Sequence, residues 1–290
     1  MELTSIQKKY IIDTNDLIEM MDNEDVLLID TREPEDYAIE HIPGAINIYD
    51  IFTYLAVDEN NCYGELSQYF TKIFSDAGLK ENQSVVIYED AMDNGYGRSC
   101  RGLFILSFLG HKNVRVLHGG YQAWINSNLP VTKNIPRISP SNFIPQIDKS
   151  IIVTKEEMLT AIENTEIIIL DCRDRAEWVA ISSSPYGPDF TPRKGRIPNA
   201  IWMEWYNTMK YENHIPWFKS PEELKELFKS HGLNEQSNIY VYCFKGARTS
   251  NTFMALKMAG FENVKNYLGS WNEWSRDESL PIEKGYPKHK

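Results

Sequence analysis

The sequence predicts an α/β protein built from two tandem domains, each a mainly parallel sheet flanked by helices. Two sequence blocks recur in the same order, which indicates a duplicated domain. Within each half, short apolar runs such as EIIILD and NIYVYC alternate with amphipathic segments, and this alternation is typical of parallel α/β domains. We therefore expect domains at residues 1–133 and 149–290, joined by a linker at 134–148.

The first recurring block is an apolar strand followed by Asp-x-Arg and, further on, by Ile-Pro-(Gly/Asn)-Ala. It is read in the first half from VLLIDTREPEDYAIEHIPGAINI, and in the second half from IIILDCRD to RIPNAIWM. The second recurring block pairs FLGHKNVRVLHGGYQAW with MAGFENVKNYLGSWNEW. Because both blocks keep their order, we interpret the whole chain as a tandem repeat.

The expected elements of the second half carry local signals of their own. SPEELKELFKSHG opens with a Ser-x-x-Glu capping box at Ser220 and ends at a glycine, so it predicts an amphipathic helix. TSNTFMALKMAG, which ends at Gly260, predicts a helix after the strand NIYVYC. Between the halves, NIPRISPSNFIPQ holds three prolines and little periodicity, and this pattern predicts the linker.

Composition and charge exclude several classes of function. The 290 residues are 42% hydrophobic and 24% charged, as is typical of globular proteins, and the net charge of −11 argues against nucleic acid and membrane surfaces as partners. We see no secretory signal and no apolar run of membrane-spanning length, so we expect a cytoplasmic protein. The cysteines Cys62, Cys100, Cys172 and Cys243 lack metal-ligand spacing, so no metal is expected; their even number leaves oxidation open.

The candidate catalytic residue is Cys243, which ends the strand NIYVYC. The helix that follows has N-terminal amides without intrahelical partners, and these amides together with the helix dipole favour an anion. Gly246 lets the chain curl tightly, while Lys245 and Arg248 add positive charge. A cysteine at a strand end is more often a core residue, but this context favours a nucleophile with a lowered thiol pKa.

The loop CFKGAR, with Asp-x-Arg and RIPNA upstream and GSWNEW downstream, resembles the rhodanese family of sulfurtransferases. The resemblance covers nearly the whole chain and implies two tandem rhodanese-like domains. It implies that Cys243 takes a sulfane sulfur from a small anionic donor, holds it as a persulfide and passes it to cyanide or a thiol, a small redox protein being one candidate acceptor. It implies no cofactor. The expected substrate-binding residues are Phe244, Lys245, Gly246, Ala247, Arg248 and Thr249.

The resemblance favours thiosulfate as the donor. Lys245, two positions after the cysteine, is typical of family members that use thiosulfate, whereas mercaptopyruvate users have small uncharged residues there. Phe244 and Arg248 depart from the usual thiosulfate and two-domain patterns. For this reason 3-mercaptopyruvate stays an alternative donor.

A second departure concerns charge near the expected pocket. Two-domain relatives have an arginine four residues after the Asp-x-Arg arginine, and this chain has Glu177 there. The extra loop at 181–196 carries Arg193, Lys194 and Arg196, and Arg193 is our candidate to replace that charge at the pocket mouth. The alternative is a solvated basic turn.

The first half lacks the nucleophile. Its strand SVVIY ends at Glu89 and Asp90 where the second half has Cys243, whereas Arg98 matches Arg248. Acidic side chains there would repel thiosulfate. We therefore expect the first half to be catalytically silent and to cover the active site.

Other conspicuous residues are interpreted as structural, and two further functions are considered. The structural set consists of the ion pairs Asp30–Arg32 and Asp171–Arg173, the loop residue His41, the packing residues Cys100 and Cys172, and the core residues Trp124, Trp271 and Trp274. A Cys-dependent phosphatase of related fold uses Cys-x5-Arg, but the spacing here is Cys-x4-Arg and no general acid is recognisable. A non-enzymatic binding protein would not need the intact CFKGAR loop.

Overall fold

The computed structural model describes residues 3–52 and 62–286, which fold into two compact units. Within the described residues, unit 1 comprises 3–52, 62–148 and 209–218, and unit 2 comprises 149–208 and 219–286. Each unit contains a parallel sheet flanked by helices, which confirms the predicted fold class.

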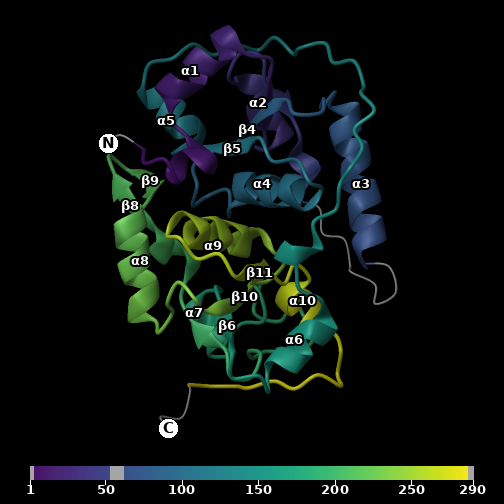
Figure 1. Ribbon diagram of the computed structural model, residues 1–290, viewed down its shortest axis with the longest axis vertical. Helices are drawn as coiled ribbons and strands as arrows, with labels where there is room; N and C mark the ends of the chain where they lie inside the picture. The colour runs from purple at the N-terminus through teal and green to yellow at the C-terminus, as the bar shows by residue number, and fades with distance from the viewer. Residues whose placement is uncertain (1–2, 53–61, 287–290) are drawn as a thin grey trace. The chain divides into compact units, whose positions relative to one another are not determined.

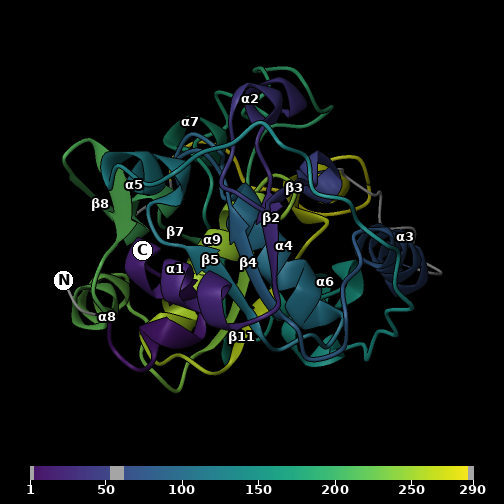
Figure 2. The ribbon, with the colours of Figure 1, turned by 90° about the horizontal axis from the view of Figure 1, so that it is seen from above.

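Unit 1 is built on a parallel sheet with the strand order β1-β5-β4-β2-β3. Its strands are β1 (Ile11–Ile12), β2 (Val26–Asp30), β3 (Ile46–Asn47), β4 (Ser84–Tyr88) and β5 (Val114–Leu117). Its helices are α1 (Thr14–Asn23), α2 (Pro34–Ile39), α3 (Cys62–Asp76), α4 (Arg98–Phe108) and α5 (Gly120–Asn126). Helices α1, α2 and α5 lie on one side of this sheet and α4 on the other (Figure 1), and Figure 2 shows β2, β4 and β5 alongside one another.

The central strand β4 explains how this sheet is covered on both faces. All five of its residues are buried, as expected for an apolar run in a parallel sheet. Val86 and Tyr88 pack into a core with Trp124 of α5. Ile87 points to the opposite face, where Gly102 of α4 leaves room: a Cβ there would lie 2.8 Å from the Ile87 side chain.

Unit 2 has a parallel sheet with the strand order β11-β10-β6-β7. Its strands are β6 (Ile167–Asp171), β7 (Ile201–Trp202), β10 (Asn238–Tyr242) and β11 (Val264–Asn266). Its helices are α6 (Lys155–Ala161), α7 (Arg175–Trp178), α8 (Pro221–Ser230), α9 (Ala247–Met258) and α10 (Ser270–Trp274). One core joins α6 and α10 to the sheet, and α8 begins with the predicted capping box at Ser220.

The antiparallel hairpin of β8 (Met209–Glu212) and β9 (Ile215–Phe218) belongs to unit 1, although its sequence lies within the second repeat. The Phe218 amide donates a 2.9 Å hydrogen bond to Nε2 of His118, and the Trp217 ring meets the His118 ring edge to face at 4.9 Å. Tyr211 donates a hydrogen bond to Asp93. The expected domain at 149–290 therefore differs from unit 2, because side-chain packing draws the hairpin back onto unit 1.

The segment at 134–148, expected to be a linker, also packs on unit 1. Ser141 Oγ donates to the main-chain oxygen of Leu79 at 2.6 Å, and the Gln146 amide donates to the Leu109 oxygen at 2.8 Å. The segment is thus hydrogen-bonded along the surface of unit 1 despite its prolines.

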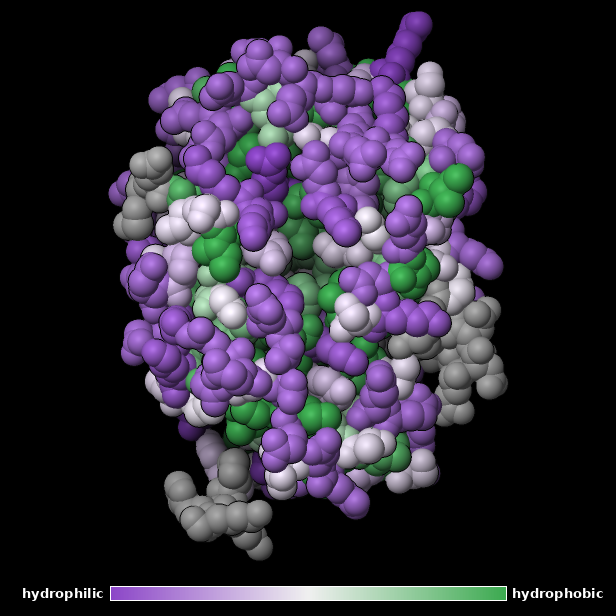
Figure 3. Space-filling model, in the orientation of Figure 1, coloured by the Kyte–Doolittle hydropathy of each residue, from purple (hydrophilic) through white to green (hydrophobic). Residues whose placement is uncertain are grey.

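Three further features were considered in the sequence, namely the polarity of the surface, membrane-spanning helices and groups of metal ligands. On the face drawn in Figure 3, hydrophilic side chains cover most of the surface and apolar side chains occur in scattered groups. Within residues 3–52 and 62–286, no helix combines the length and apolar character needed to cross a membrane. In the same part of the chain, no three His, Cys, Asp or Glu side chains are grouped to hold a metal ion.

Candidate active site

The Cys243 thiol lies directly after β10, at the start of a tight loop that leads into α9. Its Sγ accepts a 3.2 Å hydrogen bond from the Gly246 amide and lies 3.7 Å from Oγ1 of Thr249. Gly246, with φ +85°, is the N-cap of α9, and this left-handed conformation turns its amide back toward the sulfur. Cys243 is only 1% exposed, so protein groups surround the sulfur.

The surroundings of Cys243 act on its pKa in opposite directions. Burial is the largest effect and raises the pKa of the thiol. The charge of Arg248, the amide and hydroxyl of Thr249 and the Gly246 amide favour the thiolate and together outweigh burial. The pKa of Cys243 therefore lies below the ordinary value for a cysteine, in keeping with the anion-stabilising loop expected from sequence.

Arg248 stabilises that loop from within the protein. Its guanidinium is 3% exposed and forms two hydrogen bonds with Glu177, of 2.7 Å and 3.1 Å, and one of 3.1 Å with Asp174. We expected Arg248 to contact substrate, but its guanidinium is committed to these carboxylates and acts on Cys243 through its charge. Glu177, noted in the sequence only as a departure from the family pattern, is its buried partner.

Phe244 and Lys245 meet the extra loop at 181–196. The Phe244 ring is 3% exposed and packs edge to face against Tyr186 at 5.6 Å and Phe190 at 5.8 Å. The Lys245 ammonium lies 4.7 Å from the centre of the Tyr186 ring. Sequence reasoning missed these two rings, because the extra loop is an insertion within the first recurring block and has no counterpart in the first half.

Arg193 is bound to main-chain oxygens of the C-terminal segment. Its guanidinium donates to the main-chain oxygens of Trp274, Ser275, Asp277 and Leu280, which ties the extra loop to the C-terminal segment. The structure thus shows a structural role for Arg193, and its role at the pocket mouth stays a prediction.

The other two basic residues of the extra loop are paired as well. Lys194 forms an ion pair with Asp189, and the buried Arg196 pairs with Glu283. Arg193 and Arg196 are thus held by partners within unit 2, whereas the pair of Lys194 and Asp189 lies at the surface, with 33% and 82% of the two side chains exposed.

The GSWNEW motif fixes the main chain around the thiol. The Ser270 hydroxyl accepts a 3.1 Å hydrogen bond from the Cys243 amide, and the Trp271 amide donates to the Cys243 oxygen at 3.0 Å. The Asn272 amide donates a hydrogen bond of 2.9 Å to the main-chain oxygen of Phe244. Ser270 was not singled out in the sequence, although its place in the second recurring block was a usable signal.

The residues predicted to be structural are found in structural roles. Both Asp-x-Arg pairs form buried ion pairs, of 2.7 Å between Asp30 and Arg32 and 2.6 Å between Asp171 and Arg173. The tryptophans and the other conspicuous side chains are also buried, namely Trp124, Trp271, Trp274, His41, Cys100 and Cys172. Burial raises the pKa of the Cys172 thiol, in contrast to that of Cys243. The side chain of Cys62 lies outside the described residues.

In unit 1 a carboxylate takes the place of the thiol. Glu89 directly follows β4, just as Cys243 directly follows β10. The main-chain oxygen of Glu89 accepts a 2.9 Å hydrogen bond from the Tyr121 amide, and the main-chain oxygen of Cys243 accepts the equivalent bond from the Trp271 amide. The Glu89 carboxylate accepts hydrogen bonds from the Arg98 amide at 3.1 Å and the Ser99 hydroxyl at 2.5 Å. The N-terminus of α4 is therefore already occupied by a carboxyl group that the chain itself supplies.

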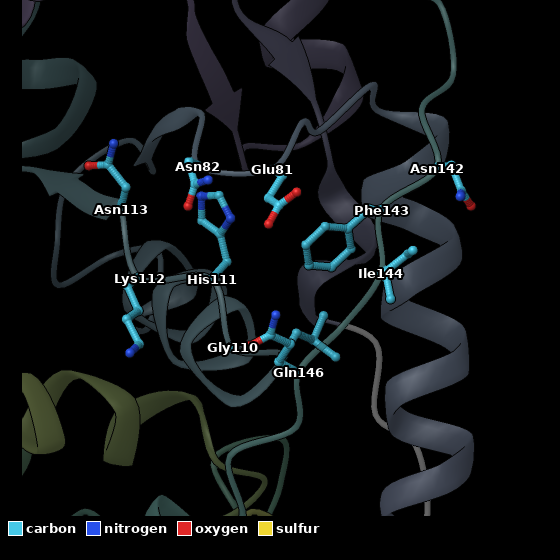
Figure 4. Close-up of a pocket in the computed structure, with 11 residues that line it drawn as sticks. Glu81, Asn82, Gly110, His111, Lys112, Asn113, Asn142, Phe143, Ile144 and Gln146 are labelled. Atoms are coloured by element: carbon cyan, nitrogen blue, oxygen red, sulfur yellow. The ribbon is translucent and has the colours of Figure 1, made fainter.

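A separate cavity of about 430 Å³ lies in unit 1, between the end of α4 and the segment at 134–148 (Figure 4). His111 and Phe143 both line it, and their rings pack edge to face with their centres 6.2 Å apart. None of the expected catalytic or substrate-binding residues lines this cavity.

Comparison with known proteins gives concordant results. The Rhodanese-like domain family matches residues 13–127 and 154–277. The sulfur carrier protein TtuD of Thermus thermophilus is 31% identical over 273 residues, covering 91% of this chain and 89% of TtuD. A thiosulfate sulfurtransferase of Corynebacterium glutamicum is 29% identical over 272 residues, covering 91% of this chain and 83% of that protein.

Solved structures share the fold. A structure of EanB in complex with ergothioneine superposes with a TM-score of 0.82 at 22% identity, covering 97% of this chain and 71% of EanB. The crystal structure of YnjE has a TM-score of 0.81 at 21% identity, covering 97% of this chain and 70% of YnjE. With both recurring halves matched by the family, the chain is a member of the rhodanese family with two rhodanese-like domains.

Proposed function

We propose that this chain is a sulfurtransferase that moves a sulfane sulfur from thiosulfate to cyanide or a thiol through a persulfide on Cys243. The observation that carries the proposal is the sulfur in its loop, where the Gly246 amide donates to Sγ and the thiol pKa is lowered. A thiolate of this kind attacks a sulfur atom without a separate general base. The names of curated relatives, which include thiosulfate sulfurtransferases, support the same chemistry.

The reaction follows from the properties of a thiolate. Sγ of Cys243 attacks the outer sulfur of thiosulfate, the sulfur–sulfur bond of the donor breaks, and sulfite leaves with the electron pair. The acceptor then attacks the outer sulfur of the persulfide, and the electron pair of the broken bond returns to Sγ. The same amides that stabilise the resting thiolate would stabilise it again as the leaving group.

Lys245 supports thiosulfate as the donor. This residue stands two positions after Cys243 and is partly exposed, so its ammonium can attract a dianion. We favour thiosulfate over 3-mercaptopyruvate for this reason. Phosphatase activity is disfavoured, because the guanidinium of Arg248 is bound to Glu177 and Asp174.

Mass spectrometry after incubation with thiosulfate tests the proposal. We expect the mass of one sulfur atom to appear on the peptide that contains Cys243, and to be absent after Cys243→Ser. Cys100→Ser, a change in the buried face of α4, is the matched control and should keep the gain. A gain of sulfur by the Cys243→Ser chain, or no gain by the unchanged chain, would refute the proposal.

Lys245→Ala should lose turnover with thiosulfate while keeping turnover with 3-mercaptopyruvate.

A further inference from the structure

The extra loop of the second repeat carries two aromatic rings beside the catalytic loop. Tyr186 and Phe190 lie 5.3 Å apart between ring centres, and both pack edge to face on Phe244, the residue next to Cys243. Phe244 is buried, but Tyr186 is 49% exposed and Phe190 is 54% exposed. About half of the surface of each of these two residues is therefore exposed, beside Phe244, which adjoins Cys243 in sequence.

Hydrogen bonds within the extra loop hold the rings in place. The Ser183 amide donates to the Pro188 oxygen at 2.9 Å, and the Ser183 hydroxyl accepts the Thr191 amide at 3.0 Å. Ser184 Oγ donates to the Gly187 oxygen at 3.0 Å. Ser183, Ser184 and Thr191 are all buried, so these hydrogen bonds fix the conformation of the loop that carries the rings.

Neither small substrate explains these rings. Thiosulfate and cyanide are compact hydrophilic anions. They have no apolar surface that they could bury against an exposed aromatic ring. An organic thiol with an aromatic group would bury its own ring against Tyr186 and Phe190. With its ring bound there, the thiol group of this acceptor would extend toward Cys243, which adjoins Phe244 in the loop CFKGAR.

We propose that Tyr186 and Phe190 select the sulfur acceptor, and that this acceptor is a thiol bearing an aromatic group. The inference rests on the proposed function. The acceptor loses its thiol proton to solvent, and its sulfur attacks the outer sulfur of the Cys243 persulfide. The bond between that sulfur and Sγ breaks, the electron pair returns to Sγ as thiolate, and the acceptor leaves as an organic persulfide.

The test uses chain loaded with thiosulfate and freed of excess donor, with loss of the persulfide followed over time. The acceptors are phenylmethanethiol, 2-mercaptoethanol and cyanide, and the variants are Tyr186→Ala, Phe190→Ala and their combination. We expect the rate with phenylmethanethiol, divided by the rate with 2-mercaptoethanol or cyanide, to fall roughly tenfold in the combined variant. Ile181→Ala, which removes a 66% exposed apolar side chain from the same loop, is the matched control and should keep the ratio.

The outcomes separate this inference from the proposed function. A loaded chain whose rate ratios are the same with and without the two rings overturns the acceptor assignment and leaves the sulfurtransferase proposal standing. A fall of all three rates in equal proportion also overturns it, because the rings would then only support the Cys243 loop. If the unchanged chain takes up no sulfur from thiosulfate, both proposals fail.

Discussion

Replacing Glu177 by glutamine is expected to destabilise the protein and, at the same time, to make the Cys243 thiol more acidic. The change keeps the shape of the side chain but removes the charge that pairs with Arg248 through bonds of 2.7 Å and 3.1 Å. Both side chains are nearly inaccessible, with 3% of Arg248 and 1% of Glu177 exposed. Removing one partner of such a pair leaves a buried charge without compensation.

The magnitude follows from the geometry of the pair. Breaking a buried ion pair costs about 3–5 kcal/mol, and we expect about 3 kcal/mol, because Asp174 still lies 3.1 Å from the Arg248 guanidinium. The midpoint of urea unfolding should fall by roughly 1–2 M. The thiol responds in the opposite sense: with its partner neutral, the positive charge of Arg248 favours the thiolate more strongly, so the pKa of Cys243 falls.

The combined variant Glu177→Gln with Arg248→Met separates the two effects. It leaves no buried charge from this pair, so most of the lost stability should return. The pKa of Cys243 should rise relative to the unchanged chain, because the charge of Arg248 is the largest influence that lowers it.

Both quantities can be measured on the same preparations. Urea unfolding gives the stability, and the ultraviolet absorbance of the thiolate as a function of pH, with the Cys243→Ser chain as background, gives the thiol pKa. A higher thiol pKa in the Glu177→Gln chain, or an unchanged pKa in the combined variant, would refute the idea that Arg248 sets the charge state of Cys243.

Three further predictions concern single residues. Burial raises the pKa of Glu89 from 4.5 to about 7, so the folded chain binds this proton more tightly than the unfolded chain does. The stability of unit 1 should therefore fall by about 3 kcal/mol as the pH rises from 4.5 to 7. Urea unfolding of Glu89→Gln should show a weaker dependence of stability on pH. Gly246→Ala forces a left-handed alanine and should cost about 1–2 kcal/mol while raising the thiol pKa, whereas unchanged thiolate absorbance would contradict the role of the Gly246 amide. Arg193→Lys keeps the charge but cannot satisfy four carbonyls, so we expect a loss of about 2 kcal/mol with KM for thiosulfate unchanged; a changed KM at full stability would restore the expected role at the pocket mouth.

Much of the fold was predictable because it rests on local patterns and on repetition. The apolar run NIYVYC predicts a buried strand, and the capping box at Ser220 predicts the start of α8. Both elements are found, although Asn238 is exposed and Tyr240 is half-buried in the strand. The position of Cys243 between strand and helix likewise follows from local sequence. These features depend on neighbouring residues, which a sequence displays directly.

What the sequence did not reveal depends on contacts between distant residues. Glu177 and Arg248 are 71 positions apart, and the pairing of their charges is visible only once both are buried together. The four carbonyls that bind Arg193 come from the main chain, which carries no sequence signal. A basic residue therefore suggests an anion site equally well whether its partner is a substrate or the protein itself.

The β8–β9 hairpin has a consequence for how the duplicated halves can be separated. Cutting the chain between residues 148 and 149 would divide the repeats cleanly in sequence, but it would strip the first half of strands that cover His118 and leave those strands attached to the wrong piece. Each half is thus an incomplete folding unit when excised at its sequence boundary. A unit 1 that is to fold alone would therefore need residues 209–218 grafted onto it, even though unit 1 carries Glu89 where unit 2 carries Cys243.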